Sequence, residues 1–266
     1  MMASSSSNNS QERHEVFLSF RGEDTRKTFT SHLHAAFKRV GINTYIDYNL
    51  ERGDEISGTL LRAIEDAKLS VIVFSKNFGT SKWCLDEVKK IIDCKKTRGQ
   101  SVVPVFYDIE PTCVRNQTGS FATAFARHEQ RFVDKPNKVQ KWRDALREAT
   151  NLSGWDCNID RLESEIVEEI AMDVLQKLNR VYVGDLDQEI AKYEQLANHQ
   201  MRYFQSTPHP AHWQNHQATV KHIRKLQMER HRRLLRIPPD MNSEPSDSNA
   251  NNDFYGVNWS NIFRYS

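Results

Sequence analysis

A carboxylate, an indole and a guanidinium in the first third of the chain are the side chains whose types and spacing could bind a small ligand. Trp83 and Glu87 are four residues apart, so in a helix they lie one turn apart on the same face. The apolar residues after Lys82 recur at helical spacing, and this pair lies at the margin of that apolar stripe. Glu87 would then stand near the start of a helix that follows a buried strand, where ligands bind in open α/β sheets. The simpler alternative is a surface acid favoured by the positive end of the helix dipole.

The run Val-Ile-Val-Phe at residues 71–74 is the strand expected to position this pair. An unbroken apolar run between two serines is typical of a strand buried on both faces, as in the middle of a parallel sheet. Residues 77–80 are predicted to form a loop, and Ser81 is a suitable N-cap for the helix that follows. Gly99 marks the expected end of that helix.

Strands and helices alternate from residue 16 to residue 180. Further strands are predicted at residues 16–20, 42–46 and 102–107, with residues 152–155 as a short fifth strand or a packed turn. Helices are predicted at residues 25–40, 57–67, 82–98, 121–132, 139–149 and 160–178. We expect the first helix to be capped by Asp24 or Thr25. Pro104 indicates an edge or a bulge in the fourth strand, because proline lacks the N–H that a central strand donates.

This alternation predicts the α/β class, with a flavodoxin-like five-stranded parallel sheet in the order 2-1-3-4-5 and helices on both faces. In that order the switch point lies between the first and third strands. The loop with Arg21 and Gly22 should therefore meet the helix start that carries Trp83 and Glu87. A cation and backbone amides would face a carboxylate and an indole, which suits a nucleotide with a phosphate and a ribose.

Composition narrows the class of protein. The 266-residue chain has a formal net charge of +2, so the whole chain does not have the basic character of a nucleic-acid binder. Its four cysteines lack metal-type spacing, which predicts reduced thiols in the cytosol. The N-terminus lacks the apolar segment of a secretory signal, and no apolar run reaches membrane-spanning length. We therefore expect a soluble intracellular protein.

Six segments in sequence order resemble the plant Toll/interleukin-1 receptor (TIR) domain of disease-resistance proteins. They are VFLSFRGEDTRKTFTSHL (16–33), GINTYID (41–47), LERGDEI (50–56), SKWCLDEV (81–88), VPVFYDIEPTCVRNQTGSF (103–121) and NLSGWD (151–156). The resemblance covers residues 14–180 and implies the same flavodoxin-like fold. No phosphate-binding GxxxxGK followed by Ser or Thr, and no leucine-rich repeat, occurs after residue 180. The resemblance therefore suggests a truncated TIR-X type without the nucleotide-binding switch and the repeats.

The resemblance also implies a reaction. TIR domains of this kind hydrolyse NAD+ or NADP+ at the nicotinamide–ribose bond, giving ADP-ribose and cyclic or branched ADP-ribose signals in innate immunity. Glu87 falls on the essential acid of the WCxxE motif. Arg21 and Gly22 fall on the loop that binds the phosphates, and Trp83 would offer a stacking wall. NAD+ would be the substrate, so no cofactor and no metal site are expected.

The expected partners follow from the same resemblance, and the expected location follows from the composition and from the basic stretch at residues 221–236. Ser31 and His32 fall on a self-association pair, and residues 47–56 fall on a mobile loop that covers a neighbouring site. The expected partners are other copies of the chain, other TIR immune receptors and, through the products, lipase-like immune heterodimers. No membrane partner is expected and nucleic acid is disfavoured. The expected location is the cytoplasm, with the nucleus as a second compartment.

A few positions depart from the family pattern. Gly58 stands where a proline is common, which implies a more mobile covering loop. Glu110, Cys113 and Asn116 replace the usual residues of a DPSDVRKQTG segment. They change a surface expected to pack between TIR domains and leave the proposed crevice intact.

The remainder of the chain is divided into segments of different character. Residues 1–13 are Ser/Asn-rich and expected to be disordered, as are residues 237–266. Residues 181–236 are predicted to be a helical extension of unknown role, broken at Pro208 and Pro210. Its basic stretch at residues 221–236 suits a nuclear-import signal or an acidic partner, and the alternative is a solvated basic helix. His209, His212 and His216 do not indicate a metal site, because prolines interrupt their spacing.

Two other functions compete with NAD+ cleavage. The first is a non-catalytic adaptor that joins other TIR domains through its surfaces, although an adaptor does not need Trp83, Glu87 and Arg21. The second is nucleotide chemistry on nucleic acid involving Cys84, which is disfavoured because Cys84 lies on the buried stripe.

Overall fold

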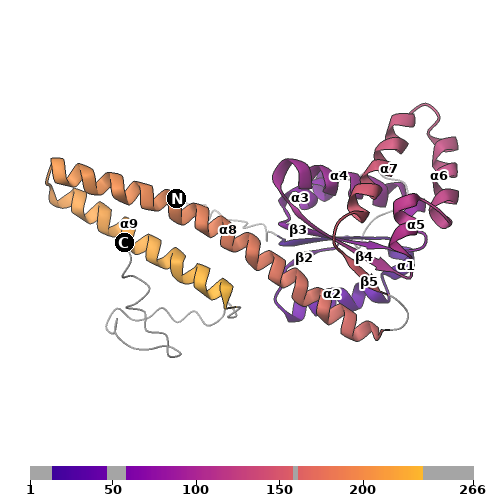
Figure 1. The fold of residues 1–266 in the computed structure, drawn as a ribbon, viewed down its shortest axis with the longest axis horizontal. Coiled ribbons are helices and arrows are strands. Elements are labelled where there is room, and N and C mark those ends of the chain that lie inside the picture. Colours follow the sequence, from indigo (N-terminus) through magenta and orange to yellow (C-terminus); the bar gives the residue numbers. More distant parts are fainter. Residues whose placement is uncertain (1–13, 47–57, 158–160, 236–266) are drawn as a thin grey trace, which may run out of the picture. The chain divides into compact units, whose positions relative to one another are not determined.

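The computed structural model describes residues 14–46, 58–157 and 161–235 (Figure 1). The chain divides into two compact units, Met1–Gln188 and Glu189–Ser266, which are described separately. The predicted leader, covering loop and tail, at residues 1–13, 47–56 and 237–266, lie outside the described residues.

The first unit is built on a five-stranded sheet. Its strands are β1 (Val16–Phe20), β2 (Thr44–Tyr45), β3 (Leu69–Phe74), β4 (Ser101–Tyr107) and β5 (Trp155–Cys157). They pair in parallel in the order β2-β1-β3-β4-β5, so the predicted fold class is confirmed. All six side chains of β3 are buried, as expected for a strand covered on both faces.

The helices of the described residues follow the strands. They are α1 (Gly22–Thr25), α2 (Phe29–Arg39), α3 (Gly58–Asp66), the 3₁₀ turn η1 (Phe78–Thr80), α4 (Lys82–Arg98), α5 (Pro111–Asn116), α6 (Ser120–Arg131), α7 (Pro136–Thr150), α8 (Glu163–Ser206) and α9 (Pro210–Leu234). Buried side chains of α3, α4, α6 and α7 form one core with one face of the sheet, and those of α2 and residues 166–178 of α8 form another. Figure 1 shows α3 and α4 on one side of the sheet and α2 on the other.

The two cores reveal which way each β1 side chain points. Phe17 belongs to the core beneath α4, whereas Leu18 and Phe20 belong to the core beneath α2. Because side chains alternate along a strand, Ser19 faces the same side as Phe17 and therefore faces α4.

The first helix differs from its prediction, because the single helix expected at residues 25–40 is divided into α1 and α2. Neither Asp24 nor Thr25 caps it. Asp24 lies inside α1, and its carboxylate is bonded to the loop after β3. Thr25 also lies inside α1, and its hydroxyl accepts a hydrogen bond from Thr30. A side chain bonded in this way does not accept from the N–H groups at the start of α2.

Pro104 does not mark an edge strand. The strand that contains it, β4, lies between β3 and β5. However, β5 begins opposite Val105, so Pro104 precedes the part of β4 that has neighbours on both sides. Residues 152–155 are likewise only partly a strand, since β5 starts at Trp155.

The expected domain boundary at residue 180 falls inside α8 rather than in a linker. Between residue 180 and the boundary of the first compact unit at Gln188, the sequence contains one glycine, Gly184. A glycine destabilises a helix by only about 1 kcal/mol relative to alanine. The helix therefore continues, and the compact units divide between Gln188 and Glu189. In the second unit, α9 starts at Pro210, where the predicted proline break lies. None of the helices in the described part of the chain combines the length and apolar character of a membrane span.

Candidate functional site

Glu87 lies in the second turn of α4 and is buried. Ser81 caps the helix as predicted, accepting a hydrogen bond from the backbone N–H of Cys84 at 3.3 Å, and Gly99 ends it with a left-handed φ of 69°. Only 3% of the Glu87 surface is exposed. The interpretation of Glu87 as a surface acid is therefore wrong. Its burial is also deeper than the marginal position that the helical pattern indicated.

The buried carboxylate has a hydrogen-bond donor from the sheet. The hydroxyl of Ser19 donates to Oε2 of Glu87 over 2.6 Å, and Ser19 is 1% exposed. A buried carboxylate is costly unless it is hydrogen-bonded, and a hydroxyl donor stabilises its charged form. The sequence analysis did not identify Ser19, because a single serine in the strand VFLSF does not indicate which distant residue it will contact.

Arg21 and Gly22 lie directly after β1, at the start of α1. The guanidinium of Arg21 forms ion pairs with Glu23 and Asp24, and the Arg21 side chain is 19% exposed. A Cβ on Gly22 would lie 2.6 Å from Nη2 of Arg26, so the backbone passes close to that second guanidinium. In this structure the predicted phosphate-binding cation is thus engaged by carboxylates of its own loop.

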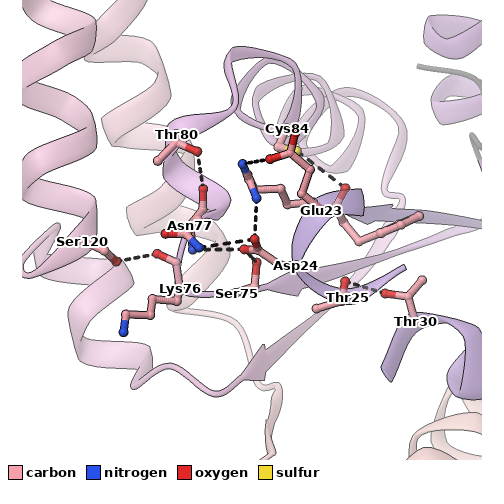
Figure 2. A network of polar contacts seen from close by, with 12 residues as sticks. Glu23, Asp24, Thr25, Thr30, Ser75, Lys76, Asn77, Thr80, Cys84 and Ser120 are labelled. Atoms are coloured by element: carbon pink, nitrogen blue, oxygen red, sulfur yellow. Dashed lines mark hydrogen bonds and ion pairs between the residues drawn. The ribbon is translucent and has the colours of Figure 1, made fainter. Parts of the chain in front are cut away.

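Asp24 joins this loop to the loop after β3. Its Oδ2 accepts a hydrogen bond from the hydroxyl of Ser75 over 2.6 Å and from the backbone N–H of Asn77 over 3.1 Å. Figure 2 shows Asp24 directed at Ser75 and Asn77, with Thr80 and Ser120 continuing the polar network. Burial alone would raise the pKa of Asp24, but the bond from Ser75, the charge of Arg21 and the bonds from Asn77 outweigh it and lower the pKa.

Hydrogen bonds of Glu87 and Cys84 to β1 show that the predicted segments meet. Burial raises the pKa of the Cys84 thiol far above its usual value, the charge of Glu87 raises it further, Arg21 opposes the rise and Asp24 adds to it. Its Sγ donates to the carbonyl of Phe20 at 3.6 Å. The end of β1 and the start of α4 therefore converge, as the strand order predicts. A thiol in this setting stays protonated, which argues against nucleophilic chemistry at Cys84.

Trp83 is half-buried on the same helix. The ammonium of Lys82 lies 4.3 Å from the centroid of the Trp83 ring, a cation–π contact. A ligand ring stacking on that face of the indole would have to displace Lys82. The stacking role of Trp83 stays a prediction.

Ser31 and His32 lie on α2, on the opposite side of the sheet from Glu87. Both are exposed. The Ser31 hydroxyl donates to the carbonyl of Thr28 over 2.7 Å, and Nδ1 of His32 lies 2.5 Å from Oε1 of Glu163 in α8. The structure does not bring this pair to the Glu87 site, which is compatible with the separate surface role predicted for it.

The cysteines and the three histidines near Pro210 were also considered in the sequence as chemical groups. The described cysteines are all free thiols. His209 caps α9, His212 contacts the carbonyl of Thr207, and His216 contacts the carbonyl of Ala197. These are the described hydrogen-bond contacts of the three histidines.

Comparison with known proteins gives a consistent result. Residues 13–197 match the family described as TIR domain. The disease resistance protein RPV1 of Vitis rotundifolia is 50% identical over 173 residues, which is 64% of this chain and 12% of that protein. The TMV resistance protein N of Nicotiana glutinosa is 45% identical over 202 residues, or 73% of this chain and 18% of that protein. This chain thus spans less than a fifth of the length of either relative.

A solved structure is similar to the first unit. It is that of the TIR domains in the activated Roq1 resistosome, which directly recognises the pathogen effector XopQ. The TM-score is 0.57 at 44% sequence identity, covering 60% of this chain and 99% of that one.

Proposed function

We propose, from the premise that this chain belongs to the TIR domain family, that it cleaves the nicotinamide–ribose bond of NAD+ or NADP+ in plant immune signalling. The observation that carries the proposal is the buried carboxylate of Glu87 near the start of α4, bonded to Ser19 of β1, the strand that leads directly into the Arg21 loop. Buried ionisable side chains are enriched at functional sites.

The proposed chemistry needs one carboxylate. Nicotinamide leaves NAD+ as a neutral molecule, taking the electron pair of the C1′–N bond, so its departure requires no general acid. Positive charge develops on the ribose as this bond lengthens, and Glu87 would stabilise it electrostatically. Water then adds to C1′ and releases a proton to solvent, giving ADP-ribose. Attack by an adenine or ribose atom of a nucleotide would instead give a cyclic or branched ADP-ribose.

Access to Glu87 sets a condition on this proposal. At 3% exposure the carboxylate is closed to a ribose, and Arg21 is engaged by Glu23 and Asp24. Substrate binding therefore requires the surroundings of Glu87 to open and Arg21 to exchange partners. We propose that self-association through the surface around Ser31 and His32 favours the open form. The similarity to TIR domains of a resistosome supports such an assembly.

The burial of Glu87 and the ion pairs of Arg21 also favour the second candidate, a non-catalytic adaptor that recruits other TIR immune receptors. An adaptor would tolerate a permanently closed Glu87.

Under the catalytic proposal, the products would act on lipase-like immune heterodimers, and the protein would act in the cytoplasm, with the nucleus as a second compartment.

One experiment separates the candidates. The purified chain is incubated with NAD+ at several protein concentrations, and nicotinamide release is measured by chromatography. We expect release that rises more steeply than linearly with protein concentration. Glu87→Gln should reduce it by at least about 10²-fold while the protein stays folded.

The matched control is Asp93→Asn, which makes the same carboxylate-to-amide change on the same helix at a surface ion pair with Lys89. It should keep wild-type activity. No release even from the artificially clustered wild-type chain would favour the adaptor, and full activity of Glu87→Gln would exclude Glu87 as the catalytic carboxylate.

A further inference from the structure

Ser19 is the one polar side chain of β1 and is buried in the middle of the sheet. It pairs with Ile72 of β3, lies beyond the two residues of β1 that pair with β2, and faces the core beneath α4 among Phe17 and Ile72. A hydroxyl in such a position needs a hydrogen-bond partner, because water cannot reach it. Its described partner is the Glu87 carboxylate, 2.6 Å away.

The contact joins the rigid centre of the sheet to the second turn of α4. Glu87 has three rotatable side-chain bonds, so a carboxylate on it would sample several positions if nothing held it. A strand-borne donor on Oε2 fixes one carboxylate oxygen, and through it the plane of the group. Groups that support a reacting side chain in this way often change rates by about 10–100-fold when removed, as seen for supporting partners in metal sites.

We propose that Ser19 is a positioning residue that holds the Glu87 carboxylate oriented toward the ribose. The inference rests on the proposed function. Ser19 forms no bond to substrate, and its hydroxyl keeps its proton throughout. Its contribution is to the transition state, where the ribose charge is greatest, and less to the binding of intact NAD+.

The chain offers a matched control on the adjacent strand. Ser70 in β3 is also fully buried, lies opposite Phe17 in the sheet and therefore shares the face of Ser19. Its hydroxyl donates to Oε1 of Gln100 over 3.3 Å and not to Glu87. Removing either hydroxyl makes the same chemical change at the same depth, but only one change reaches Glu87.

The test compares Ser19→Ala, Ser19→Thr and Ser70→Ala in nicotinamide release at saturating and limiting NAD+. We expect Ser19→Ala to lower kcat by about 10–100-fold with KM within about threefold of wild type. Ser19→Thr retains the hydroxyl and should recover most of kcat, and Ser70→Ala should keep it. Unfolding of the Ser19→Ala, Glu87→Gln and double variants is also measured. The double variant should lose less Tm than the sum of the single losses, because the two residues share one contact.

The outcomes separate this inference from the proposed function. A wild-type chain without nicotinamide release overturns the proposed function, and the inference with it. An active wild type with unchanged kcat in Ser19→Ala, an equal loss in Ser70→Ala, or no recovery in Ser19→Thr overturns the inference alone. Additive Tm losses would show that the Ser19–Glu87 contact does not operate in solution and would overturn it as well.

Discussion

Replacing Asp24 with asparagine removes one negative charge from the junction of the two loops and keeps the shape of the side chain. Asp24 accepts hydrogen bonds from Ser75 and from the backbone and side chain of Asn77, and it pairs with Arg21. An amide in its place turns an NH2 group toward groups that themselves donate. Hydrogen bonds to a charged acceptor contribute about 1.5–3 kcal/mol each.

The expected loss is smaller than the sum of these bonds. Side-chain exposures of 12% for Asp24 and 19% for Arg21 leave the ion pair partly screened by solvent, and asparagine retains a neutral acceptor. We expect Asp24→Asn to lower the free energy of unfolding by about 2–3 kcal/mol at pH 7. For a domain of this size, that corresponds to a fall in Tm of about 4–12 °C.

The pH dependence identifies the charge as the cause. Because the folded pKa of Asp24 is lowered, the unfolded chain binds more protons in the range between the two pKa values. The stabilisation is therefore present above the unfolded pKa, about 3.9, and is lost as the pH falls through the folded value. The difference in Tm between wild type and Asp24→Asn should shrink from pH 7 toward pH 3.

Thermal unfolding at a series of pH values measures the Tm difference between wild type and Asp24→Asn. Asp134→Asn is the control, because Asp134 is exposed after α6. A Tm of Asp24→Asn within about 1 °C of wild type at pH 7 would refute the reasoning. So would a difference that stays constant as the pH falls, because the loss would then not come from the charge.

Two further predictions concern the surface and the thiols. His32→Ala should weaken self-association in sedimentation velocity with a Tm shift below about 1 °C, because an exposed polar contact contributes little stability. The control Arg39→Ala removes another exposed contact between α2 and α8. Equal weakening by both variants would argue against a specific role for His32. Alkylation of the folded chain at pH 8, followed by mass spectrometry, should modify the partly exposed Cys113 first. Burial raises the pKa of Cys84 strongly and that of Cys157 to about 12, so these thiols should react more slowly. Early modification of Cys84 would contradict this expectation.

The elements that the sequence predicted best are those with a strong local signal. The run at residues 71–74 became the central strand β3, and Ser81 and Gly99 bound α4 as expected. Their apolar periodicity and cap chemistry are local properties, so tertiary contacts reinforced them. The strand order followed because parallel strands joined by helices permit few topologies.

The site was less predictable because its contacts join residues far apart in sequence. Ser19 and Glu87 are 68 residues apart, and Asp24 and Ser75 are 51 apart. Nothing in the local pattern of either partner indicates the other. The helix start near Asp24 was predicted wrongly for the same reason. The Asp24 carboxylate accepts a hydrogen bond from the distant Asn77 instead of capping the helix.

The ion pairs of Arg21 have a consequence for ligand selection. Glu23 and Asp24 are held beside its guanidinium by the chain itself, so their effective concentration exceeds that of ordinary solutes. An anion that reaches this cation must compete with two tethered carboxylates. A solute with one diffuse charge competes poorly, whereas adjacent phosphates present several charges together. Under the proposed function, the loop would therefore favour ligands with adjacent phosphates over anions with a single diffuse charge.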